Sequence, residues 1–170
     1  MDKRFIVKTI SVDDLNSFLD SYKPNFDLPK LETIFNDTLE LCFNQQHVKY
    51  TNVIHACYDK KEEKYCAILN IGTTTAIDDL VSINVEFLFI EKEYRSKIFI
   101  ELNGVKLSQY LLQDYIIGDI GFYIKDNIGI SAVSITPINE KVRDTYSNMN
   151  FITIDGSGSK KAEDWMVCIY

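Results

Sequence analysis

The chain has 170 residues, of which 46% are hydrophobic and 25% are charged, so its composition is that of an ordinary globular protein. Such a length fits a single domain over residues 1–170, and folding should bury roughly 70% of the unfolded surface. The 18 basic and 25 acidic residues give a net charge of −7. Since non-specific attraction to phosphate needs a positive surface, we expect neither nucleic acid nor a membrane as a partner.

The sequence contains no run of about 18 apolar residues, so no membrane-spanning helix is expected. The apolar stretch that follows Arg4 is too short for the core of a signal peptide, which favours a cytoplasmic protein. None of the cysteines forms a Cys-x-x-Cys pair, and the chain has only 2 histidines. We therefore expect no metal site, and buried free thiols at four positions. These are Cys42, Cys57, Cys66 and Cys168.

Hydrophobic periodicity and turn residues predict the elements in chain order. Ser11 and Asp14 form a capping box at the first helix, and Pro29 suits the first turn of the second. In the run 80–90, alternate apolar residues including Val85 and Phe87 share one face of a strand. We expect strands at 4–10, 53–58, 65–72, 80–90, 128–135, 150–155 and 165–170, helices at 12–22, 29–45, 98–117 and 137–148, and polar turns at 73–79 and 156–159.

Three segments within this order match a known pattern. Residues 85–97 form a strand that runs into a charged loop, 135–139 form a strand end with an Asn, and 139–151 contain Tyr146 ahead of Asn150. They resemble the fourth strand, the fifth strand and the closing signature of the GNAT superfamily of N-acetyltransferases. The resemblance implies an α+β fold, with a mixed, mostly antiparallel sheet of about seven strands and helices on both faces.

The resemblance also implies an activity, in which acetyl-CoA serves as co-substrate and a primary amine attacks it directly in a ternary complex. The amine would belong to a small molecule, a peptide N-terminus or a Lys side chain, and a homodimer is an option for such folds. Glu86 would act as the general base and Tyr146 as the general acid. The cofactor would be held by Leu88, Ile90, Arg95, Ser96, Lys97, Ile98, Phe99, Ile100 and Asn139.

Two departures from the family pattern leave alternatives open. Ile98 and Ile100 stand where small residues usually let phosphates approach the backbone, and helix packing is the competing interpretation of both. A second register places the loop at 101–106, with Glu101 in the position of a cationic residue. The chain is then either an acetyltransferase, a catalytically inactive GNAT-fold module that binds a protein partner, or an acyltransferase with another donor. For His47 and His55 a structural role is favoured over a catalytic one.

Overall fold

The computed structural model describes residues 3–43, 52–77, 80–154 and 165–170. These gather into two compact units, the first made of Met1–Gly72 with Glu86–Ser108 and the second of Thr73–Val85 with Gln109–Tyr170. Seven strands form a sheet in the order β1-β2-β3-β4-β7-β9-β8, and two short strands form a separate pair, β5-β6. The prediction of a single domain stays a prediction.

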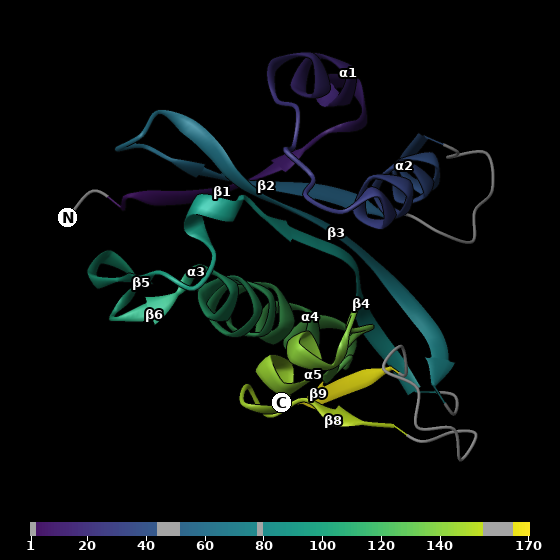
Figure 1. Ribbon diagram of the computed structural model, residues 1–170. Helices are drawn as coiled ribbons and strands as arrows, with labels where there is room; N and C mark the ends of the chain where they lie inside the picture. The colour runs from purple at the N-terminus through teal and green to yellow at the C-terminus, as the bar shows by residue number, and fades with distance from the viewer. Residues whose placement is uncertain (1–2, 44–51, 78–79, 155–164) are drawn as a thin grey trace. The chain divides into compact units, whose positions relative to one another are not determined.

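The first unit begins with antiparallel strands. β1 (Phe5–Ile10) pairs with β2 (Val53–Asp59), which pairs in turn with the start of β3 (Lys64–Ile77). α1 (Val12–Ser21) and α2 (Pro29–Phe43) lie over one face of these strands (Figure 1). The predicted Ser11 cap is confirmed, because the Asp14 backbone N–H donates to Ser11 Oγ at 3.1 Å, and the Asp14 carboxylate accepts from the Ser11 hydroxyl at 2.6 Å. The core beneath both helices contains Leu15, Phe18, Phe35, Cys42, Ile54, Ala56, Ile68, Phe87 and Phe89.

β4 (Leu80–Ile90) is the predicted strand 80–90, but it is buried more completely than its pattern indicates. The expected apolar face includes Phe87 and Phe89, which are buried. On the other face Ser82 and Asn84 are also buried, at 0% and 1% exposure. Ser82 Oγ lies 2.8 Å from Ser134 Oγ, so the buried Ser82 hydroxyl forms a hydrogen bond with a protein group in place of water.

The predicted helix 98–117 begins too early. After a 3-10 turn, η1 (Lys92–Tyr94), the chain forms a hairpin from β5 (Ile98–Phe99), the 3-10 turn η2 (Ile100–Leu102) and β6 (Val105–Lys106). Asn103 and Gly104 have φ values of 59° and 79°, in the left-handed region that a helix interior does not adopt. The helical residues are continuous from Leu107, through α3 (Leu107–Gln109) and the π-helix η3 (Tyr110–Gly121), to the end of α4 (Phe122–Ile128).

The helix also continues past residue 117, where it was predicted to end. A Cβ at Gly121 would lie 2.7 Å from the ring of Tyr170, so this glycine makes room for an aromatic side chain. The end comes at Gly129, whose φ of 84° provides a left-handed cap. The next strand, β7 (Ala132–Ile135), therefore starts later than the predicted residue 128.

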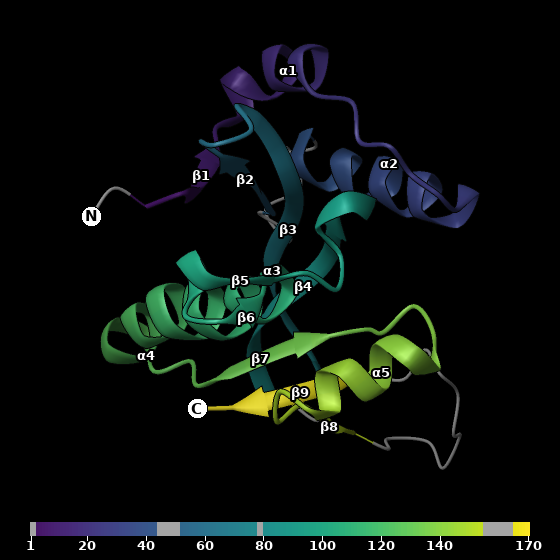
Figure 2. The same cartoon turned by 60° about the vertical axis from the view of Figure 1, so that its left-hand side comes forward.

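The second unit ends with α5 (Glu140–Ser147), β8 (Ile152–Thr153) and β9 (Met166–Ile169). β9 pairs antiparallel with both β7 and β8 (Figure 2). Asn150 has a φ of 66°, the left-handed conformation that asparagine tolerates in place of glycine. Two other boundaries differ from the prediction. β3 extends through the Thr-rich run that was predicted to form a turn, because β-branched residues favour strands. α5 starts at Glu140 and not at residue 137. The predicted loop 156–159 lies outside the described residues.

Candidate functional site

The second half of β4 carries the predicted base and two predicted cofactor contacts. β4 pairs in parallel with β7 at Ile83, Asn84 and Val85, where the recorded register ends. β4 itself runs on from Glu86 to Ile90, whereas β7 ends at Ile135. The backbone N–H and C=O groups at the edge of an extended strand can form hydrogen bonds with an added chain that carries amide groups.

The side chains along this half-strand alternate as expected. Glu86 is exposed, Leu88 is half-buried and Ile90 is buried at 9%. The intervening Phe87 and Phe89 point into the core under α1 and α2. Glu86 thus lies on the opposite face of β4 from the aromatic core, with its carboxylate accessible to solvent.

Arg95, predicted to contact the cofactor, is held in place by protein groups. Its Nη1 and Nη2 lie 2.6 and 3.1 Å from the two Asp27 carboxylate oxygens. Its Nε donates to the Ile90 carbonyl at 2.6 Å, and its guanidinium lies 5.1 Å from the centre of the Phe89 ring. The hydrogen bond from Arg95 lowers the pKa of Asp27. Arg95 therefore braces the segment between α1 and α2 against the end of β4.

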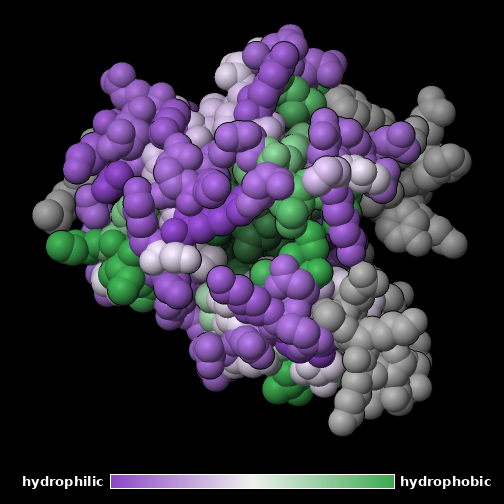
Figure 3. Space-filling view, viewed as in Figure 1, coloured by the Kyte–Doolittle hydropathy of each residue, from purple (hydrophilic) through white to green (hydrophobic). Residues whose placement is uncertain are grey.

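The rest of the predicted loop leads into the hairpin, with Ile98 and Phe99 in β5 and Ile100 in η2. Ser96 has a φ of 64°, Lys97 is exposed, and Phe99 is buried with its ring centre 4.9 Å from that of Phe5. Ile98 and Ile100 are 67% and 89% exposed, and Figure 3 shows a hydrophobic surface where the hairpin lies. Ile98 lies in β5 and Ile100 opens the short 3-10 turn η2, so neither packs in an α-helix as the competing interpretation had it.

The helix that follows β4 starts immediately after the second register, 101–106. Its first residue, Leu107, is fully buried, and Leu111 and Leu112 are as well. The Asn103-Gly104 breaker and the spacing of those leucines are the sequence signals for this start, whereas the predicted helix began at Ile98. The backbone N–H groups at this start are the ones that a helix N-terminus offers to an anion.

Glu101, the first residue of the second register, belongs to a charged cluster. Arg4 donates to both oxygens of Asp59 at 2.9 and 2.8 Å and to Glu101 at 2.9 Å. Burial acts to raise the pKa of Asp59, but hydrogen bonds from Arg4, the Lys61 N–H and the Tyr94 hydroxyl outweigh it and lower the pKa. The cluster ties the hairpin to the ends of β1 and β2.

The remaining two predicted site residues lie on α5. Asn139 is its N-cap, because the Val142 N–H donates to Asn139 Oδ1 at 3.0 Å. Tyr146 is 8% exposed, its ring centre is 6.0 Å from that of Phe151, and burial raises its pKa. Within the described residues the Tyr146 hydroxyl makes no hydrogen bond, so it stays protonated and uncommitted at neutral pH.

His55 and the cysteines have structural surroundings. His55 is 8% exposed on β2, its Nδ1 lies 3.4 Å from Thr9 Oγ1, and burial lowers its pKa to about 4. His47 lies outside the described residues. The prediction of four buried free thiols is confirmed. In the part of the chain that the structure describes, no three His, Cys, Asp or Glu side chains are grouped as a metal site, and no helix is long and apolar enough to cross a membrane.

No known protein family and no curated protein matches the sequence. Solved structures do match. A mutant of the toxin AtaT, bound to acetyl-CoA and the C-terminus of the antitoxin AtaR, is 11% identical with a TM-score of 0.62, over 98% of this chain and 93% of that one. AtaT with acetyl-methionyl-tRNAfMet is 12% identical with a TM-score of 0.60, over 97% and 94%. The KacTA–DNA complex is 12% identical with a TM-score of 0.62, over 97% and 92%.

At this level of identity the likeness establishes the fold. The predicted mixed α+β fold of the GNAT N-acetyltransferases, with a mostly antiparallel seven-strand sheet, is therefore confirmed. The exclusion of nucleic acid as a partner was wrong, and so was the choice of a small molecule, a peptide N-terminus or a Lys side chain as acceptor, because structures of this fold hold DNA and acetyl-methionyl-tRNAfMet. Net charge is a poor guide here, since binding to phosphate depends on local surface charge and not on the sum over the chain.

Proposed function

We propose that this chain is an acetyl-CoA-dependent N-acetyltransferase. The observation that supports it most directly is the match, over nearly the whole chain, to a structure that holds acetyl-CoA. The half-strand from Glu86 to Ile90 adds to this support, because it continues beyond the recorded pairing with β7. Its backbone, at Leu88 and Ile90, would pair with the amide groups of the pantetheine arm.

For the pyrophosphate we propose the backbone N–H groups at the helix start, Leu107, as the main contact. Such contacts need no particular side chain, which fits a loop without the family's glycines. Lys97 and Lys106 are exposed and add positive charge on either side of the hairpin. Arg95 would act by holding the end of β4 in place, and Asn139 would contribute as the cap of α5.

As acceptor we propose the α-amino group of an aminoacyl-tRNA. A protein of the same fold is crystallised with acetyl-methionyl-tRNAfMet, in which the amino acid carries the acetyl group. An ester-linked amino acid presents a primary amine, which is the nucleophile that the sequence analysis expected. In the neutral form, that amine attacks the thioester carbonyl carbon and forms a tetrahedral intermediate.

Two side chains are proposed to move the protons. Glu86 takes the proton that the amine loses, directly or through water, and the carbon–sulfur bond then breaks. Tyr146 protonates the leaving thiolate; its raised pKa keeps the phenol protonated, and it has no competing hydrogen bond in the described residues. AtaT and KacT have each been crystallised with a tyrosine replaced by phenylalanine, the change that removes a phenolic proton donor while the ring remains.

The test has two parts that fail separately. First, calorimetric titration with acetyl-CoA measures donor binding, with desulfo-CoA as a non-reactive control. Ligand at about 100 times its Kd should also raise the free energy of unfolding by about 2.7 kcal/mol. Second, labelled acetyl-CoA is incubated with methionyl-tRNA or with methionine methyl ester. Transfer to the tRNA alone supports the full proposal, and transfer to the ester alone contradicts the acceptor. Absence of binding of any CoA species would contradict the enzyme and favour a binding module.

A further inference from the structure

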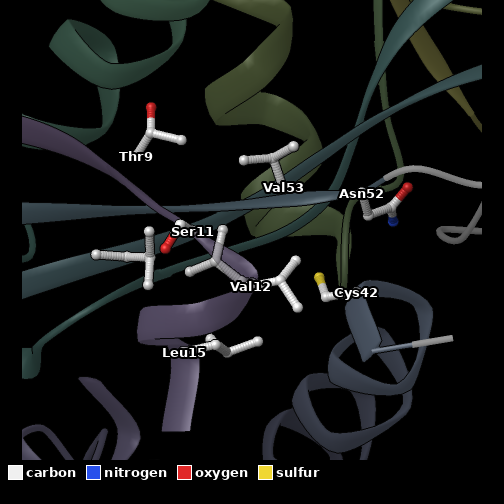
Figure 4. Close-up of a pocket in the computed structure, with 9 residues that line it drawn as sticks. Thr9, Ser11, Val12, Leu15, Cys42, Asn52 and Val53 are labelled. Carbon is white, nitrogen blue, oxygen red and sulfur yellow. The ribbon is translucent and has the colours of Figure 1, made fainter. Parts of the chain in front are cut away.

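A pocket of about 150 Å³ opens in the first unit, on the face of β1 and β2 that α1 and α2 cover (Figure 4). Its rim is made of exposed residues, among them Val12 at 37% and Val53 at 38% exposure. Its floor is made of buried ones, Leu15 at 1%, Ile54 at 2% and Cys42 at 3%. None of these residues belongs to the groups proposed for acetyl transfer.

The walls are mainly apolar, because six of the nine lining residues are Ile, Val, Leu or Cys. An apolar cavity of about this volume in another protein stays dry and takes up benzene. Here the surroundings are rigid, since Cys42 in the floor accepts a hydrogen bond from Asn70 Nδ2 at 3.5 Å and Leu15 and Ile54 belong to the core. A compact ligand of that size would fill the space without displacing a core side chain.

Three lining residues, Thr9, Ser11 and Asn52, have polar side chains, and of these only Asn52 is buried. Asn52 is 7% exposed, and its Nδ2 has no hydrogen-bond partner within the described residues. A buried donor left unpaired is costly, so such groups usually point to a missing partner. Gly72 on β3 accommodates this amide, because a Cβ at Gly72 would overlap the Asn52 side chain. The backbone is thus shaped to hold an unpaired amide beside an apolar pocket.

We propose that this pocket binds a small apolar molecule, of one five- or six-membered ring or equivalent size, that carries a single hydrogen-bond acceptor for Asn52 Nδ2. The rim between β1 and α1 provides access, and the buried floor provides the apolar contact. Such a ligand would contact β1, β2, α1 and α2 together and would stabilise the first unit on binding.

Cyclopentanone is a suitable probe, with cyclopentane as the matched apolar control. Isotope-labelled protein is titrated with each, and backbone amide shifts locate the site. We expect cyclopentanone to shift the signals of Val12, Val53 and Ile54. Asn52→Leu, which keeps the approximate size but removes the donor, should weaken cyclopentanone binding roughly tenfold and leave cyclopentane binding unchanged or tighter.

A second pair of variants tests the location independently. Val12→Phe at the exposed rim should narrow the mouth and weaken both probes, whereas Val12→Thr, of similar volume, should not. Thermal unfolding of each variant checks that it is folded. The proposal is overturned if cyclopentanone shifts no pocket signal, if Asn52→Leu affects both probes equally, or if Val12→Phe has no effect. The first of these outcomes would assign the unpaired amide to water alone.

Discussion

The brace between Arg95 and Asp27 allows a quantitative test of what the segment after β4 does. The two side chains are 33% and 36% exposed and meet in a bidentate pair. Pairs at this exposure contribute at most about 1 kcal/mol, because solvent screens them. The additional hydrogen bond from Arg95 to the Ile90 carbonyl is charged, and such bonds contribute about 1.5–3 kcal/mol when well shielded. After a discount for exposure, we expect Arg95→Ala to lower the free energy of unfolding by about 2 kcal/mol.

Thermal unfolding measures this directly. For a chain of this size about 2 kcal/mol corresponds to a fall in Tm of about 4–8 °C. Asp27→Asn removes only the ion pair and should lower the free energy of unfolding by about 1 kcal/mol. The free energies of unfolding of the double variant and of Arg95→Ala should agree within a few tenths of a kcal/mol. At pH 7 the ion pair between Arg95 and Asp27 should make its full contribution to the free energy of unfolding. Since the folded-state pKa of Asp27 is lowered, the contribution is present above its ordinary value of 3.8 and is lost as the pH falls below it.

The same variants separate a structural role from a phosphate contact. If Arg95 acts as a brace, the Kd for acetyl-CoA should change by about twofold or less in Asp27→Asn. In Arg95→Ala the fall in the free energy of unfolding should be larger than the change in the free energy of acetyl-CoA binding. An Arg95→Ala protein with unchanged Tm and roughly tenfold weaker acetyl-CoA binding would refute the brace and support the direct contact with the cofactor.

Three further outcomes follow from particular side chains. Tyr146→Phe should lower kcat about 10²- to 10⁴-fold while the Kd for acetyl-CoA stays constant; an equal change in both would argue against a proton donor. His55 has a folded-state pKa of about 4 against an ordinary 6.5, so its contribution is full above pH 6.5 and should fall by about 2 kcal/mol between pH 7 and pH 5, a dependence that urea unfolding of His55→Gln should lack. Gly121→Ala should be about 1 kcal/mol less stable than Gly118→Ala in thermal unfolding, because only at Gly121 would the added methyl group meet the Tyr170 ring; equal stabilities would contradict that packing.

Local chemistry alone was enough for much of the fold. The Ser11 cap, the amphipathic helices that follow it and the strand 80–90 were predicted correctly, because short-range hydrogen bonds and hydrophobic periodicity decide them. The element order led to the fold class, which the solved structures confirm.

Tertiary contacts decided the rest. The residues after Ile98 form a hairpin instead of a helix, and this hairpin is tied down by Arg4, which is 97 positions away from Glu101 in the sequence. The helical residues continue past Gly121, where the absence of a side chain leaves room for the ring of the distant Tyr170. Such partners are invisible to a window of neighbouring residues. The sequence could name the residue types of a GNAT-like site, but which arginine is committed to a carboxylate and which buried amide lacks a partner depend on contacts that only the folded chain makes.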